Sequence, residues 1–135
     1  MSNIHTIVAG VVLLTVISIA FGGGFLLRVL NRTFAANDLQ RGYFRAGHAH
    51  AGVLVILGLV VMLLLAQAGV GGILATLSLG VLASAILMPA GFFLSVVGNS
   101  PHKPNSLRHL IPAGGIVLVI GVGSAGIGLI RAGIG

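Results

Sequence analysis

The sequence has no cysteine and no tryptophan, and Asp38 is its only acidic residue among 135. Without cysteine, disulfides, thiolate metal sites and thiol nucleophiles are excluded. A single carboxylate also excludes the paired acids of a glycosidase, a carboxylate-rich metal site and the acidic relay of a proton-coupled transporter. The lack of a further carboxylate general base disfavours hydrolytic or transferase chemistry, but it leaves open whether the protein is an enzyme.

Charge of either sign is scarce, and hydrophobic residues dominate. Charged residues make up 6% of the chain and hydrophobic residues 57%, with a mean hydropathy of +1.19. A soluble domain has about 25% charged residues, so this chain has too few to cover a water-exposed surface. The composition therefore predicts one integral membrane domain. The 22 glycines suit a bilayer, where small residues let helices approach closely.

Four runs of the sequence are long and apolar enough to cross a bilayer, for which a helix needs about 20 residues. We therefore expect an all-α fold, an integral membrane four-helix bundle. The short turn after the second run predicts an antiparallel hairpin. Pro89 is expected to kink the third helix, because proline removes a backbone hydrogen bond. The predicted spans are approximately residues 4–27, 48–68, 70–97 and 107–130.

The basic residues are distributed unequally between the two ends of this bundle. Six of the seven Lys and Arg residues flank the connections after the first and third spans, and only Arg131 lies at the opposite end. Lys and Arg in short connections favour the cytoplasmic side of a membrane. We therefore expect residues 31–47 and 98–106 to lie in the cytoplasm, and both termini to lie on the extracytoplasmic side of the membrane.

Small residues recur at helical spacing on the third and fourth predicted spans. Such stripes are typical of faces where membrane helices pack closely. Because four thin, glycine-rich helices enclose little interior, we also expect a homo-oligomer or a larger membrane complex. Gly22, Gly23 and Gly24 fit neither stripe cleanly. The stripes consist of Gly114, Gly121, Gly128 and Gly135 on the fourth span, and of Gly72, Thr76, Gly80, Ser84, Gly91, Ser95 and Gly98 on the third.

Four of the five histidines fall at the predicted cytoplasmic end, far apart in sequence: His48, His50, His102 and His109. Two residues apart on a helix, His48 and His50 point about 200° away from each other, so they cannot chelate one ion together. We expect His50 to face the interior, opposite His109. His48 and His102 are then the alternate ligands.

Neutral imidazole is the commonest metal ligand, and histidines on facing helices suit a transition metal or the iron of a haem. Nearby Arg45 and Arg108 would repel a bare dication, but they would pair with the propionates of a haem. The predicted function is therefore binding of a redox cofactor, with b-type haem as the first candidate. His50 and His109 are its predicted axial ligands, between the second and fourth spans.

Two other interpretations use the same residues. An anionic or amphipathic small molecule, such as a lipid, a quinone or a thiol conjugate, would receive bidentate hydrogen bonds from Arg and a donor from His. A ligand-free accessory subunit would pack through its glycine faces. In either case basic side chains at span ends attract anionic lipid headgroups, at about 1 kcal/mol each. The bilayer is thus an expected partner, and nucleic acid is not.

The segment Arg45-Ala46-Gly47-His48-Ala49-His50-Ala51-Gly52, with Gly91-Phe92-Phe93-Leu94-Ser95 and Pro104-Asn105-Ser106-Leu107, resembles a family of small bacterial four-span membrane proteins. This resemblance covers most of the chain and implies a fold but no function. The Arg-Ala-Gly-His start is also similar to the Arg-Ala-His motif of membrane-associated eicosanoid and glutathione metabolism proteins. One residue is inserted here, and the Asn and Glu that follow in that family are apolar, so no glutathione site is implied. Gly-His-Ala-His is similar to histidine-rich spans of haem-containing respiratory membrane proteins.

Overall fold

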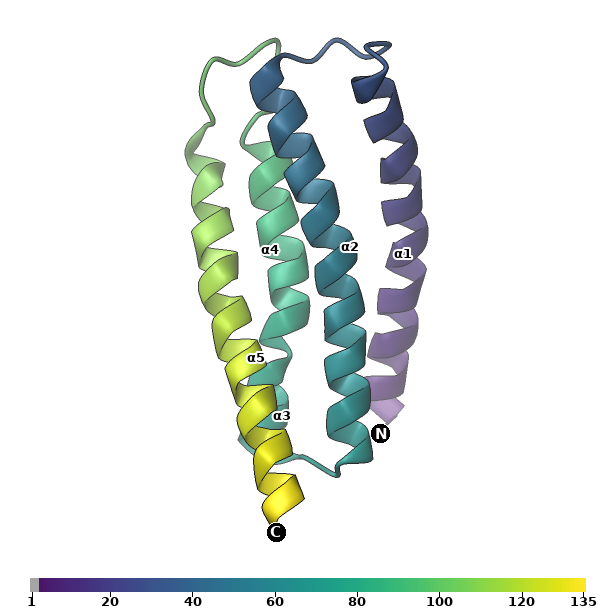
Figure 1. Cartoon of the computed structure of the whole chain (residues 1–135), viewed down its shortest axis with the longest axis vertical. Coiled ribbons are helices and arrows are strands. Elements are labelled where there is room, and N and C mark those ends of the chain that lie inside the picture. Colours follow the sequence, from purple (N-terminus) through teal and green to yellow (C-terminus); the bar gives the residue numbers. More distant parts are fainter. Residues whose placement is uncertain (1–2) are drawn as a thin grey trace.

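The computed structural model describes residues 3–135, and within this range the regular structure is entirely helical (Figure 1). Four stretches are long and apolar enough to cross a membrane: residues 4–30, 38–67, 72–94 and 106–134. The all-α bundle of four long helices is thus confirmed, and it fits a multi-pass membrane protein. The elements are α1 (Asn3–Leu30), α2 (Asp38–Gln67), α3 (Gly72–Ser78), α4 (Gly80–Leu94), the 3₁₀ helix η1 (Ser106–His109) and α5 (Leu110–Ile134).

The long helices run alternately in opposite directions, so each end of the bundle carries its own set of termini and connections (Figure 1). Both termini and the turn between α2 and α3 lie at one end, here called the termini end. The connections 31–37 and 95–105 lie at the other, here called the loop end. Helix α4 packs against both α2 and α5, whereas α1 packs against α2 and is the outermost helix.

Helix α2 begins earlier than the predicted span, at Asp38 rather than at His48. A reciprocal cap starts it: the Asn37 side chain accepts a hydrogen bond from Gln40 N at 2.9 Å, and the Gln40 side chain accepts one from Asn37 N at 3.1 Å. This capping box satisfies two backbone donors that a helix start leaves unpaired. Residues 38–47 are therefore the first turns of α2, and the connection shortens to residues 31–37.

The third span is interrupted, but not at Pro89. Helix α4 continues through Pro89 to Leu94, and the break lies at Leu79, between α3 and α4. This break lies beside a close approach to α5: a Cβ added to Gly80 would lie 2.8 Å from the carbonyl oxygen of Val117. The predicted hairpin before α3 is confirmed. Gly69 and Gly72 have φ values of +66° and +65°, which favour glycine.

Gly114, Gly121 and Gly128 of the α5 stripe form a close-packing face, as predicted, whereas Gly135 is exposed and contacts no other helix. A Cβ added to Gly121 would lie 2.7 Å from the backbone nitrogen of Val81, and one added to Gly114 would lie 2.5 Å from Met88 Cγ. From the other side, a Cβ on Gly91 of α4 would lie 2.9 Å from the backbone nitrogen of Ile111. Helices α4 and α5 therefore touch backbone to backbone. Van der Waals contact of this kind is a main attraction between helices in lipid.

We expect Gly121→Ala to destabilise the bundle by about 1–3 kcal/mol, the usual effect of overpacking, because the Val81 backbone cannot move aside cheaply. Gly123→Ala is the matched control. It lies on the same helix with nothing within 4 Å of its added Cβ, so it should be neutral or slightly stabilising. Thermal unfolding of both variants in detergent measures the effect. Equal midpoints for the two variants would contradict the proposed contact.

Candidate functional site

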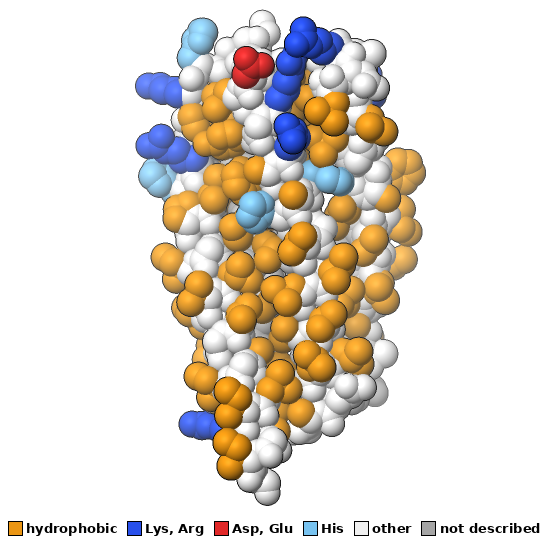
Figure 2. All heavy atoms as spheres, viewed as in Figure 1, with side chains coloured by type: hydrophobic (Ala, Val, Ile, Leu, Met, Phe, Trp, Pro, Cys, Tyr) orange, Lys and Arg blue, Asp and Glu red, His pale blue; other side chains and the backbone are white. Residues whose placement is uncertain are grey.

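The loop end carries most of the positive charge of the protein, and Figure 2 shows Lys and Arg side chains gathered there beyond a band of hydrophobic side chains. The single acidic residue, Asp38, is paired with Arg41, at 3.6 Å between Oδ1 and Nη1. Within residues 3–135 the other basic side chains of this end are exposed and have no carboxylate at ion-pair distance. We call these five the cationic rim: Arg28, Arg32, Arg45, Lys103 and Arg108.

His48 is half-buried and faces α1. A Cβ added to Gly22 would lie 3.3 Å from His48 Nδ1, and one added to Gly23 would lie 3.7 Å from His48 Nε2. The imidazole thus occupies space that side chains at these two positions would restrict. Gly22 and Gly23, from the glycine run that fits neither packing stripe, therefore leave room for His48 between α1 and α2.

His50 faces a different neighbour, the aromatic side chain of Phe92 on α4. The two ring centroids are 5.0 Å apart, and the rings are tilted by 35°. His50 Nδ1 lies 2.7 Å from the carbonyl oxygen of Ala46. Because a carbonyl only accepts, Nδ1 must carry the proton in this hydrogen bond, and in a neutral imidazole Nε2 then carries the lone pair. The prediction that His48 and His50 point to different sides of the helix is confirmed.

The remaining candidate ligands lie near the surface. His102 and His109 are exposed, in the 95–105 connection and in η1. In the half of the bundle next to the loop end, α4 lies between α2 and α5. A Cβ on Gly47 of α2 would meet Phe93 Cε2 at 2.8 Å, while Gly91 on the same helix as Phe93 packs against α5.

The interval between the second and fourth spans, where the cofactor site was expected, is therefore filled by α4 at this level. Small residues on α2 and α4 allow that insertion, because they remove the side chains that would hold α4 away. Among residues 3–135 no group of three or more His, Cys, Asp or Glu side chains is placed to hold a metal ion. The pairing of His50 with His109 stays a prediction.

An aromatic cluster fixes the elements beneath the cationic rim. Ring pairs link Phe25 of α1 to Phe34 at 5.0 Å and to Phe44 at 5.4 Å, and Phe44 stacks on Phe93 at 5.8 Å. Phe44 is only 8% exposed. Each such pair adds about 0.5–1.5 kcal/mol beyond burial. Together with His48, this cluster attaches α1 to the rest of the bundle.

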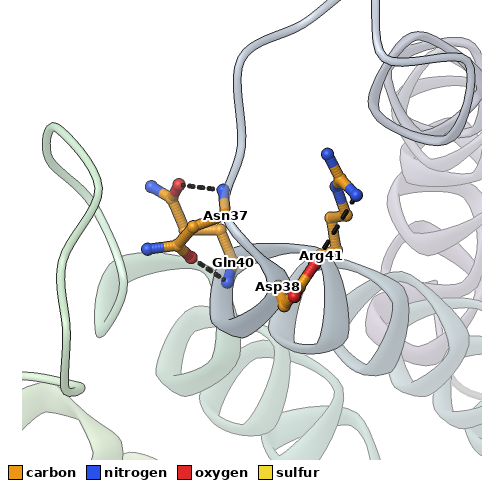
Figure 3. Close-up of polar contacts among 4 residues, drawn as sticks. All are labelled: Asn37, Asp38, Gln40 and Arg41. Atoms are coloured by element: carbon orange, nitrogen blue, oxygen red, sulfur yellow. Dashed lines mark hydrogen bonds and ion pairs between the residues drawn. The ribbon is translucent and has the colours of Figure 1, made fainter.

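A second set of contacts joins the two connections of the loop end. Figure 3 shows the cap formed by Asn37 and Gln40 beside the Asp38–Arg41 ion pair. Gln40, which is 5% exposed, also donates from Nε2 to the carbonyl oxygens of Val96 at 3.1 Å and Gly98 at 3.0 Å. The side chain of Asn37 donates to Pro101 O at 2.8 Å. These bonds hold the connection 95–105 against the start of α2.

Asn37 and Gln40 are not among the residues predicted from the sequence, although their spacing carries a local signal. An Asn followed three positions later by Gln is the spacing of a capping box. The cross-bonds from the same side chains to residues 96–101 have no local signature, because they depend on how the helices pack.

Comparisons with protein-family models, with curated proteins and with solved structures found no match to this chain. The site must therefore be judged by its chemistry. It offers a fixed surface with five exposed cations and two half-buried imidazoles on the adjoining part of α2. Such a surface can bind anions.

Proposed function

We propose that this chain is a multi-pass protein of the bacterial cell membrane, with the loop end in the cytoplasm and both termini outside. The lengths of the four apolar helices, 27, 30, 23 and 29 residues, support insertion. The concentration of cations at the loop end supports the orientation. No residue in the most apolar stretch of the first helix is buried inside the bundle. This supports lateral packing against a second copy or another membrane subunit.

We further propose that the protein binds an anionic amphipathic molecule, with its charged group on the cationic rim and its apolar part along the helices. One observation carries this proposal: five cations are exposed at one end, and the only acidic side chain is already paired with Arg41. A bound anion would supply the missing negative charge. Guanidinium groups suit phosphate, because they present parallel donors to two of its oxygens.

The connections of the loop end are held in place by hydrogen bonds. This favours binding of an anion at a defined site over a general electrostatic attraction to the surface. Gln40 and Asn37 hold both connections together, so the cations near them lose less conformational freedom when an anion binds. Arg45 lies three residues before His48, and residues at this spacing share a helix face. Arg45 and His48 can therefore contact the same ligand, Arg45 from the surface and His48 from a position further along α2.

A test uses spin-labelled phosphatidylglycerol and phosphatidylcholine in vesicles that contain the purified protein. We expect the wild type to prefer the anionic lipid. Because each cation near an anionic headgroup contributes about 1 kcal/mol, the Arg45→Gln/Arg108→Gln variant should lose most of this preference. Electron paramagnetic resonance measures the bound fraction of each lipid.

Arg131→Gln is the control, because it removes one charge from the termini end of the same helix bundle. This control should keep the preference for phosphatidylglycerol. An unchanged preference in the double variant, or the same loss in the control, would contradict binding at the cationic rim. A soluble competitor, inorganic phosphate, separates recognition of a free anion from recognition of a lipid.

A second candidate is the redox-cofactor site, and the orientation of His50 favours it. The hydrogen bond from Nδ1 to Ala46 O leaves the Nε2 lone pair as a ligand, an arrangement common for metal-binding histidines. In this candidate b-type haem would supply electron transfer, His50 and His109 would hold its iron, and Arg45 and Arg108 would pair with its propionates. The insertion of α4 between α2 and α5 gives this candidate less support than the anion site.

This second candidate predicts near-stoichiometric iron and a haem absorption band in protein purified in mild detergent. His50→Ala should abolish the band, because it removes a side chain that would hold the iron, whereas His5→Ala, near the other end, should keep it. Elemental analysis and visible spectra provide the measurement. Folded, colourless wild-type protein without iron would exclude this candidate and leave the anion site untouched.

A further inference from the structure

A cavity of about 270 Å³ lies at the termini end, at the opposite end of the bundle from the cationic rim. Its walls come from α1, α2 and α3, and it includes the turn between the last two. His5 contributes from α1, Met62 and Ala66 from α2, and Ala75 and Ser78 from α3. The proposed anion site uses none of these residues, so this cavity is a separate feature of the molecule.

The lining of the cavity favours an occupant without charge. No Lys, Arg, Asp or Glu is among the residues that line it, and most of the walls are aliphatic. The polar side chains are the imidazole of His5 and the hydroxyl of Ser78. Ser78 Oγ donates to Ala75 O at 2.6 Å, so its oxygen keeps lone pairs that can accept a hydrogen bond. An occupant that matches this lining is uncharged and carries one polar group on an apolar body.

The break in the third span forms part of the same wall. Leu79, which lines the cavity, bonds through its N–H to Thr76 O at 3.2 Å, three residues back, instead of to Ala75 O. Ala75 O accepts the Ser78 hydroxyl. Irregular backbone within an apolar span is tolerated where it is covered by protein or lines a cavity. The break and the cavity are thus one local feature.

We propose that this cavity binds an uncharged amphiphile of about one ring in size, with a hydroxyl group directed to His5 and Ser78. A volume of about 270 Å³ is near the lower limit of ligand pockets, about 300 Å³. The site is therefore too small for a haem or a whole phospholipid. The ligand class is that of small neutral alcohols and phenols, which partition into a bilayer from either side.

The test uses two photoreactive probes, a diazirine-bearing octanol and the corresponding diazirine-bearing alkane, on the full chain in detergent. We expect adducts of the alcohol to concentrate in residues 62–79, as mapped by mass spectrometry. Ala75→Leu fills the cavity and should reduce this labelling at least fivefold. Ala83→Leu, on an exposed position of α4, is the matched control and should leave it unchanged. Ala66→Val provides a smaller filling change if Ala75→Leu fails to fold.

The polar contact is tested by His5→Phe, which keeps a ring at this position but removes its nitrogens. We expect about fivefold weaker labelling by the alcohol, the effect of one net hydrogen bond, and no change for the alkane. Equal labelling by both probes would overturn the proposal in favour of an acyl chain as the occupant. If labelling were spread along the outer helix faces and unaffected by Ala75→Leu, the cavity would not be a binding site, and the proposal would be wrong. Neither result affects the preference for anionic lipid at the loop end.

Discussion

Backbone contact between α4 and α5 is the constraint on which the rest of this structure depends. Gly121 and Gly80 remove the side chains at one crossing, and Gly91 and Gly114 do so nearer the loop end. Lipid gives no hydrophobic drive for such helices to associate, so short-range packing must hold them together. The contact places α4 between α2 and α5 in the loop-end half of the bundle, and α1 packs on α2 from outside.

The loop end is built on that arrangement. Phe93 of α4 stacks on Phe44 of α2, which in turn packs against Phe25 of α1. Gln40 then bonds to the carbonyl groups that follow α4. These contacts fix the surface from which the cationic rim projects, while the bundle below presents apolar side chains. A fixed cationic surface next to an apolar one matches the two parts of an anionic amphiphile, which is the basis of the proposed function.

Much of the fold was predictable, because the signals for it are local. Four apolar runs, the turn before Gly72 and the seven-residue glycine spacing of α5 each follow from a short stretch of sequence. The start of α2 was missed because residues 38–47 are too polar to count as a span, although they continue its helix. Other features depend on neighbouring helices: the break lies at Leu79, and His48 and His50 face α1 and Phe92.

Single-cysteine labelling tests most directly whether the cationic end faces the cytoplasm, and the chain has no native cysteine to interfere. Asn99→Cys lies in an exposed connection of the loop end, and Gly71→Cys lies in the exposed turn at the termini end. With a membrane-impermeant maleimide on right-side-out membrane vesicles, we expect labelling of Gly71→Cys at once and of Asn99→Cys only after permeabilisation. Immediate labelling of Asn99→Cys with protection of Gly71→Cys would show that the cationic end faces outward.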